Sequence, residues 1–219
     1  MVNPFQRPAR SRRPWLFSAW LTAAWLLLVA TTQAGVWINE ILFNPTGSDL
    51  PNEYVELRGT PNFILSNGTY LVSINGDTNS DPGTVQNVFD LSGRALGGNG
   101  FLVLLQNSNS YFASGNATVL VNNNGSGYGS GASSSVGHRG KNGQTDLENA
   151  SITYLLIQSA SQPVPGLDID ANNDGTPDGA EYAGWTVLAR RGWSRPLRWQ
   201  CCAAARTLRE WLVHCADSD

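Results

Sequence analysis

The central part of the chain has few of the residues from which most active sites are built. Between residues 35 and 189 there is no cysteine and only one histidine, His138, because Cys201, Cys202 and Cys215 all lie near the C-terminus. This argues against a disulfide framework, a histidine-rich zinc or two-metal centre and a cysteine nucleophile in this segment. No Gly-x-Ser-x-Gly motif is present either. We therefore assign no catalytic residue and expect a protein that is not an enzyme.

Positive charge is also scarce in this segment. Fourteen Asp and Glu residues face only four Lys and Arg residues between positions 35 and 189, although the whole chain has a net charge of only −3. Such a surface repels phosphate backbones, so nucleic-acid binding is not expected. A cation is the ligand that this charge balance favours.

The first 34 residues predict export. Basic residues come first, an apolar stretch follows over residues 15–30, and small residues lead up to Ala34. This order is typical of a secretory signal peptide, and the apolar stretch is shorter than the roughly 20 residues of a membrane span. We predict cleavage after about Ala34 and a secreted or cell-surface protein, with membrane attachment only if the segment stays uncleaved. Residues 11–16 also resemble a twin-arginine signal, so the export route stays open.

Short runs of β-branched and aromatic residues recur between residues 35 and 189, each bounded by Gly, Asn, Pro or Asp. Helical periodicity is almost absent, and this spacing of short runs is typical of a two-sheet sandwich. A segment of this length buries a sufficient core without disulfides. We predict an all-β fold, an immunoglobulin-like β-sandwich. The predicted strands are 36–43, 54–59, 70–74, 85–89, 101–105, 118–121, 152–157 and 185–188.

Residues 122–143 are rich in Asn, Gly and Ser. They contain too few apolar side chains to offset the entropy of ordering, so we predict a long flexible loop. A phosphate-binding glycine loop is the alternative, but its Gly-Lys-Ser/Thr ending is missing. His138, Arg139 and Lys141 are expected to form a solvated cluster in this loop.

The composition changes after residue 189 to Arg, Ala, Trp and Cys. Six of the ten basic residues outside the signal segment lie in residues 190–219. An amphipathic helix over about residues 197–215 is one interpretation. The preferred hypothesis is that this tail is not native to the domain and reflects a shifted reading frame or a truncated gene. The predicted organisation is thus a signal peptide (1–34), a sandwich (35–189) and an atypical tail (190–219).

Two short motifs open the predicted sandwich. Residues 38–45 read Ile-Asn-Glu-Ile-Leu-Phe-Asn-Pro, and residues 52–57 read Asn-Glu-Tyr-Val-Glu-Leu. They resemble the Ile-Asn-Glu and Glu-Tyr-Val-Glu-Leu strands of bacterial lamin-tail domains, and residues 90–104 resemble the next stretch of that family. The resemblance implies an immunoglobulin-like sandwich used as an attachment or recognition module, without catalysis. The long segment 63–87 departs from the family and leaves the strand order open.

Strand alternation separates the carboxylates of these motifs. Glu53 and Glu56 are expected on opposite faces, whereas a paired-carboxylate acid–base site needs both groups on one side. We therefore expect one edge carboxylate and one solvent carboxylate. The same alternation places Asn39 and Glu40 on different faces, and Glu40 is expected to be partly buried and hydrogen-bonded to a turn.

The strongest local signal is a run of oxygen-bearing side chains over residues 170–181, Asp-Ala-Asn-Asn-Asp-Gly-Thr-Pro-Asp-Gly-Ala-Glu. It fits the twelve-residue calcium loop, with oxygen side chains at loop positions one, three, five, nine and twelve and a glycine at six. Calcium takes six to eight oxygen ligands, and Gly175 permits the sharp turn that brings them together. Asp168 adds an overlapping register. The predicted ligands are Asp168, Asp170, Asn172, Asp174, Thr176 through its carbonyl, Asp178 and Glu181.

The surroundings of this loop indicate a structural site. Pro163, Pro165 and Gly166 preclude a full helix before it, and Pro177 lacks the backbone N–H through which paired loops join. We expect one loop that acts alone and binds Ca²⁺ for stability. The alternative is a solvated acidic turn.

These observations predict a non-catalytic, exported binding or structural module with Ca²⁺ as its ligand. It would bind an unidentified extracellular macromolecule or space other domains. The alternative is an accessory domain of a truncated exported hydrolase, either a nuclease or a phosphoesterase.

Overall fold

The computed structural model of the chain describes residues 35–193. The predicted signal peptide and most of the predicted tail lie outside the described residues, and so does the helix expected over residues 197–215. Within residues 35–193, no helix is both long enough and apolar enough to cross a membrane.

Four strands form the first sheet, in the order β1-β2-β5-β6. They are β1 (Val36–Leu42), β2 (Tyr54–Gly59), β5 (Phe101–Leu105) and β6 (Thr118–Val121). The pairs β1–β2 and β2–β5 are antiparallel, whereas β6 runs parallel to β5. A parallel neighbour requires a crossover connection, and residues 106–117 supply it.

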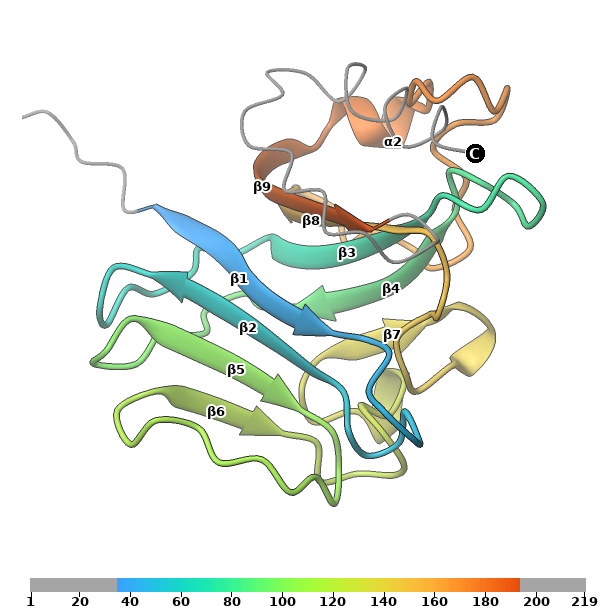
Figure 1. Ribbon diagram of the computed structural model, residues 1–219. Helices are drawn as coiled ribbons and strands as arrows, with labels where there is room; N and C mark the ends of the chain where they lie inside the picture. The colour runs from blue at the N-terminus through green and yellow to red at the C-terminus, as the bar shows by residue number, and fades with distance from the viewer. Residues whose placement is uncertain (1–34, 194–219) are drawn as a thin grey trace, which may run out of the picture. The chain divides into compact units, whose positions relative to one another are not determined.

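Five strands form the second sheet, in the order β7-β4-β3-β8-β9 (Figure 1). They are β3 (Thr69–Asn75), β4 (Val85–Asp90), β7 (His138–Gly140), β8 (Ile152–Gln158) and β9 (Thr186–Trp193). All of these pairs are antiparallel. β9 runs past the boundary predicted at residue 189, and the Arg191 side chain donates to the Ile38 carbonyl oxygen at 3.1 Å. Residues 190–193 therefore belong to the sheet.

The main core lies between the two sheets. Val55 and Leu57 of β2, Leu102 and Leu104 of β5 and Leu71 of β3 are all buried in it. These positions alternate along their strands, as expected for strands with one face toward a core.

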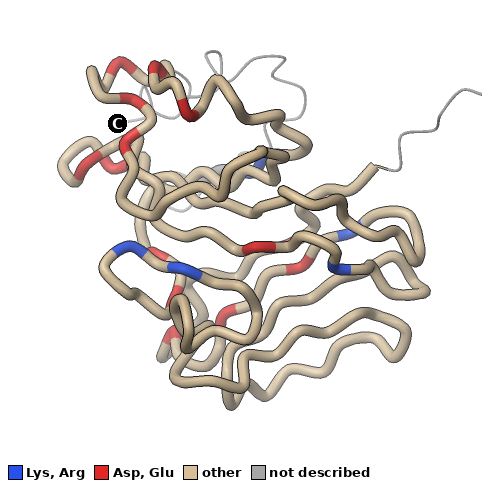
Figure 2. Tube along the Cα trace, turned by 180° about the vertical axis from the view of Figure 1, so that it is seen from behind, with Lys and Arg blue, Asp and Glu red and all other residues tan. Residues whose placement is uncertain are grey.

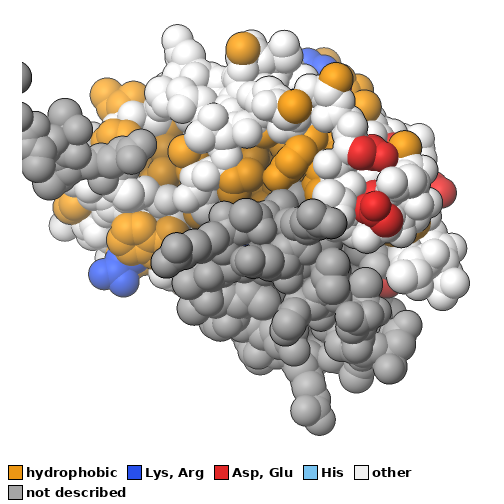
Figure 3. All heavy atoms as spheres, turned by 90° about the horizontal axis from the view of Figure 1, so that it is seen from above, with side chains coloured by type: hydrophobic (Ala, Val, Ile, Leu, Met, Phe, Trp, Pro, Cys, Tyr) orange, Lys and Arg blue, Asp and Glu red, His pale blue; other side chains and the backbone are white. Residues whose placement is uncertain are grey.

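A second core covers the outer face of the five-stranded sheet. Val72 and Leu155 point away from the main core and contact Ile169 and Trp185, which belong to the segment between β8 and β9. All seven residues of β3 are therefore buried. Val164 in the same segment is exposed, and Figure 3 shows hydrophobic side chains at the surface in the view from above.

The structure confirms the predicted all-β sandwich. Every one of the eight predicted strands is present, and the short strand β7 was not predicted. Two 3₁₀ turns, η1 (Gly131–Ser133) and η2 (Lys141–Gly143), and the helix α2 (Ala180–Ala183) complete the described elements.

The prediction of a flexible, solvated loop over residues 122–143 is wrong. Tyr128 and Val136 in this segment are fully buried in the main core. The side chain of Asn122 is also buried and donates to the carbonyl oxygens of Asn124 at 2.8 Å and Gly127 at 3.0 Å. These hydrogen bonds order the segment although it has few apolar side chains to bury.

His138 was predicted to be solvated and is fully buried in β7. Its Nε2 lies 2.7 Å from Asn87 Oδ1, and its Nδ1 contacts the Gly129 carbonyl oxygen. Burial lowers the pKa of His138 to about 4, although the Gly129 carbonyl favours the charged ring. Arg139 is exposed and Lys141 forms an ion pair with Asp81 at 3.3 Å, so the three residues do not act as one cluster.

Candidate metal site

The acidic loop starts from a fixed point at the edge of the second core. The backbone N–H of Ile169 donates to the Gly83 carbonyl oxygen at 3.0 Å, and that of Val85 donates to the Leu167 carbonyl oxygen at 2.8 Å. The Ile169 side chain is buried against the outer face of β3, β4 and β8. The first acidic residues of the loop are thus held against the start of β4.

The absence of a side chain at Gly83 allows Asp168 and Asp170 to lie close to the start of β4. Its φ of +81° favours glycine, and a Cβ there would lie 2.7 Å from Asp170 Cβ and 3.0 Å from Asp168 Oδ1. Neither distance leaves room for a side chain. The close approach of the loop to β4 therefore depends on glycine at this position.

Gly175 turns the chain back onto Asp170. Its φ is +79°, and its backbone N–H donates to Asp170 Oδ2 at 2.9 Å. Asn173 also has a positive φ, of 55°. This is the sharp turn that the calcium-loop pattern predicts at loop position six.

Further side-chain oxygens accept backbone N–H groups within the loop. Asn172 Oδ1 accepts from Asp174 N at 3.0 Å, Asp174 Oδ1 accepts from Thr176 N at 2.7 Å, and Asp178 Oδ1 accepts from Ala171 N at 3.1 Å. These bonds fold the loop around Asp170. The second oxygen of Asp174, Oδ2, accepts from Asn172 Nδ2 at 3.3 Å, whereas Asp178 Oδ2 has no hydrogen-bond partner among the described residues.

Asp170 is the unusual member of this set. Its side chain is only 4% exposed, and its Oδ1 has no hydrogen-bond partner among the described residues. Burial raises the pKa of Asp170, the charges of Asp174 and Asp178 raise it further, and hydrogen bonds from the backbone of Gly175 and Asp174 oppose the rise. An uncompensated buried carboxylate is costly, so this oxygen is suited to a cation.

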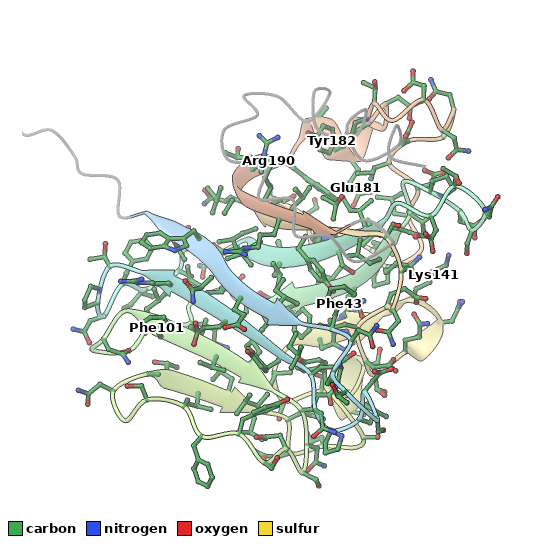
Figure 4. The ribbon with its side chains drawn as sticks, viewed as in Figure 1. Phe43, Phe101, Lys141, Glu181, Tyr182 and Arg190 are labelled. Atoms are coloured by element: carbon green, nitrogen blue, oxygen red, sulfur yellow. The ribbon has the colours of Figure 1, made fainter. Side chains whose placement is uncertain are left out.

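Not all of the predicted ligands are brought together. Asp168 Oδ1 accepts from Asp170 N at 2.9 Å, and this hydrogen bond stabilises the turn at the start of the loop. Glu181 lies on α2, beside Tyr182 in Figure 4, and its carboxylate makes no hydrogen bond to another described residue. Over residues 35–193, no three His, Cys, Asp or Glu side chains converge closely enough to hold a metal ion.

The donor set fits a hard cation. Every predicted ligand offers oxygen, which calcium prefers, and the backbone bonds place Asp170, Asn172, Asp174 and Asp178 in one loop. Figure 2 shows acidic positions gathered on this segment near the label of the C-terminus, with few basic positions nearby. Among the described residues, no helix lies between the end of β8 and the loop, as predicted.

Glu53 is a buried carboxyl that sequence reasoning missed. It was expected at an edge or in solvent, and it is fully buried at the start of β2. Its Oε2 accepts from Gln106 Nε2 at 2.7 Å and from Leu147 N at 2.8 Å, whereas its Oε1 has no hydrogen-bond partner among the described residues. Burial raises the pKa of Glu53 to about 9. The group is therefore a neutral acid at pH 7, and the motif around it carries no signal of this.

Glu56 points to the opposite side, as predicted, but the expectation for Asn39 and Glu40 is wrong. A β-bulge lies between Ile38 and Glu40. Because a bulge sets two residues against one, Asn39 and Glu40 both turn to the outer face. Asn39 Nδ2 donates to Glu56 Oε1, and the exposed Glu40 accepts from Tyr54 Oη at 2.7 Å.

No protein-family model matches the chain, and no curated protein is similar enough to match it. The resemblance to lamin-tail domains therefore rests on the motifs of the sequence alone.

Proposed function

We propose that the protein is a non-catalytic, exported binding or structural module, a lamin-tail-like, immunoglobulin-like β-sandwich whose loop 168–181 is stabilised by Ca²⁺. The observation that carries the calcium proposal is the buried Asp170 Oδ1, which has no partner among the described residues and lies in the field of Asp174 and Asp178. A bound Ca²⁺ would offset two of these three negative charges.

Six residues of the loop would supply the oxygen ligands of the ion. Asp170, Asn172, Asp174 and Asp178 would supply side-chain oxygens, Thr176 its carbonyl oxygen and Glu181 two carboxylate oxygens. Ca²⁺ would supply positive charge and no reaction step. Because Ile169 ties this loop to the second core, binding would stabilise the cover of the five-stranded sheet.

The motifs that resemble lamin-tail domains support the module assignment by their position. Residues 38–45 include most of β1 and residues 52–57 most of β2, which pair in one sheet. Residues 98–104 include most of β5, the other neighbour of β2. The resemblance therefore covers strands that pack together around one core.

Thermal unfolding of the full-length chain, with and without 10 mM Ca²⁺, tests the calcium proposal. With a Kd of roughly 10⁻⁴ to 10⁻³ M, typical of extracellular modules, binding adds about 1.4 to 2.7 kcal/mol to stability. This raises the Tm by roughly 3–10 °C. Asp174→Ala should lose the increase.

Two controls make the result specific. Glu148→Gln, which removes a carboxylate outside the loop, should keep the calcium-dependent increase. Mg²⁺ should give a smaller increase, because it requires a tighter octahedral set of ligands. A wild-type Tm that is unchanged by Ca²⁺, together with no heat in a calorimetric titration, would overturn the calcium-stabilised loop.

A further inference from the structure

A pocket of about 220 Å³ opens on the outer face of the four-stranded sheet. Its floor is apolar, formed by Val103 and Leu105 of β5, and the crossover connection 106–117 supplies one wall through Tyr111 and Phe112. The pocket is independent of the acidic loop, which covers the other sheet.

Two carboxylates form the opposite wall. Glu40 of β1 and Glu56 of β2 are direct register partners and both line the pocket. Like charges placed directly opposite each other on neighbouring strands destabilise a sheet. No Lys or Arg among the described residues forms an ion pair with either of them. Their juxtaposition therefore favours a cation from another molecule.

Each carboxylate has one oxygen engaged and one available. Glu40 Oε1 accepts from Tyr54 Oη, and Glu56 Oε1 accepts from Asn39 Nδ2. The second oxygen of each has no hydrogen-bond partner among residues 35–193. The internal donors hold the two side chains in place while leaving two acceptors side by side.

Aromatic rings complete the pocket. Tyr54 and Tyr111 pack edge to face with their centroids 5.1 Å apart, and Tyr111 Oη donates to the Asn52 carbonyl oxygen. Phe112 is 100% exposed. A fully exposed phenyl ring beside paired carboxylates buries no apolar surface in the fold of its own chain. Such a ring is suited to contact with a partner.

Arg58, which is two positions after Glu56 and on the same face of β2, shows that this face accommodates a guanidinium group. Arg58 lies between two aromatic rings, with its guanidinium carbon 5.9 Å from the Trp37 ring centroid and 5.2 Å from that of Phe101. Phe101 is labelled at the end of the four-stranded sheet in Figure 4. Arg58 is thus engaged by rings and leaves Glu56 without a cation.

We propose that this pocket binds the guanidinium group of an arginine side chain presented by a partner protein. A planar guanidinium carries five N–H donors and can bridge two carboxylates, and it also stacks on aromatic rings. Its aliphatic stem would lie on Val103 and Leu105. The volume suits one side chain, being below the usual range of small-molecule sites. This inference deepens the proposed binding role and rests on it, but it does not need the calcium loop.

Guanidinium fits these walls better than the other common cations. A metal ion would gain nothing from the apolar floor or from Phe112. A lysine ammonium is a compact and strongly hydrated charge, which cannot span two separate carboxylates in one plane. We therefore expect arginine to bind more tightly than lysine.

The test is a titration of the full-length chain with the peptide acetyl-Gly-Arg-Gly-amide, followed by the NMR signals of the tyrosine rings. The same peptide with lysine, and with citrulline as the uncharged isostere of arginine, serve as probes of the head group. The arginine peptide should shift the Tyr54 and Tyr111 signals saturably, the lysine peptide should bind more weakly, and the citrulline peptide should not bind.

Variants connect this binding to the pocket. Glu40→Gln and Glu56→Gln keep the side-chain size and should each weaken binding by about two- to fivefold, as for a lost charge pair near a surface. Phe112→Ala should weaken binding without lowering the Tm, because the ring is fully exposed. Glu148→Gln removes the same charge elsewhere and should bind like the wild type.

Several results would overturn the proposal: no saturable shift with the arginine peptide, equal binding of the citrulline peptide, or unchanged binding by the Glu40→Gln/Glu56→Gln double variant. Lysine binding as tightly as arginine would overturn the choice of guanidinium. The calcium-dependent Tm, measured on the same samples, separates the two proposals. A retained calcium increase without peptide binding removes only the arginine pocket.

Discussion

The backbone N–H of Leu147 donates to Glu53 Oε2 at 2.8 Å, although the two residues are 94 positions apart in the chain. Gln106 Nε2 donates to the same oxygen at 2.7 Å. One carboxyl group thus ties the start of β2 to the end of β5 and to the segment before β8. Because both donors meet Oε2, the proton of the neutral acid belongs on Oε1.

This buried acid makes stability depend on pH. The pKa of Glu53 is raised from 4.5 to about 9 in the folded state. The contribution of the Glu53 carboxyl group to stability is complete below about pH 4.5. It decreases as the pH rises from about 4.5 to about 9 and is lost above about pH 9. Glu53→Gln removes the titration. Urea unfolding between pH 5 and 9 should show the variant gaining on the wild type by up to about 1.4 kcal/mol per pH unit.

Glu148→Gln is the matched control for this measurement, because its side chain is only partly buried. Its unfolding free energy should run parallel to that of the wild type across the same pH range. If the Glu53→Gln curve also runs parallel to the wild type, the carboxyl is not a neutral buried acid.

Glycine at position 83 should be required for the loop. Gly83→Ala places a Cβ 2.7 Å from Asp170 Cβ at a φ of +81°, and the strain and clash together should cost roughly 2–5 kcal/mol. Gly93→Ala is the matched control, since Gly93 has a φ of +71° and nothing within 4 Å of its added Cβ. Denaturant unfolding should show a cost of about 1–2 kcal/mol for Gly93→Ala. Equal costs would contradict the close approach.

The strands were predictable because apolar alternation and turn residues are local signals. Val55 and Leu57 alternate with Tyr54 and Glu56 in the sequence, and the structure keeps that pattern. The acidic loop was also predictable as a segment, since its spacing of oxygen side chains and Gly175 is local. What the spacing could not supply was the packing of Asp170 against Gly83.

The errors arose where contacts distant in sequence decide the structure. A bulge after Ile38 moves Glu40 to the outer face, and nothing in the local alternation indicates it. His138 is buried because Asn87 and Gly129 meet its ring, although its neighbours are polar and glycine-rich. The amino-acid composition of a segment indicates how much apolar surface it can bury. It does not indicate packing that depends on hydrogen bonds between polar groups.

The burial of His138 should be visible in its titration. Its pKa is lowered from 6.5 to about 4, so its contribution to stability is complete above about pH 6.5 and is lost as the pH falls through about 4. An NMR titration of the full-length chain should show one imidazole with a midpoint near 4. His138→Gln, which leaves His214 as the other histidine, assigns the signal. A His138 midpoint near 6.5 would contradict the burial.

Two substitutions distinguish the two overlapping registers of the calcium loop. Asp168 Oδ1 accepts the N–H of Asp170 at 2.9 Å, a bond that the amide oxygen of Asp168→Asn preserves. Glu181 has no hydrogen-bonded partner among residues 35–193 and would supply two oxygens to the ion in the register that starts at Asp170. In calorimetric titrations of the full-length chain, Glu181→Gln should therefore weaken calcium binding by about tenfold or more, since each factor of ten corresponds to about 1.4 kcal/mol. Asp168→Asn should change it by less than about threefold. The reverse order of effects would place the ion in the register that starts at Asp168.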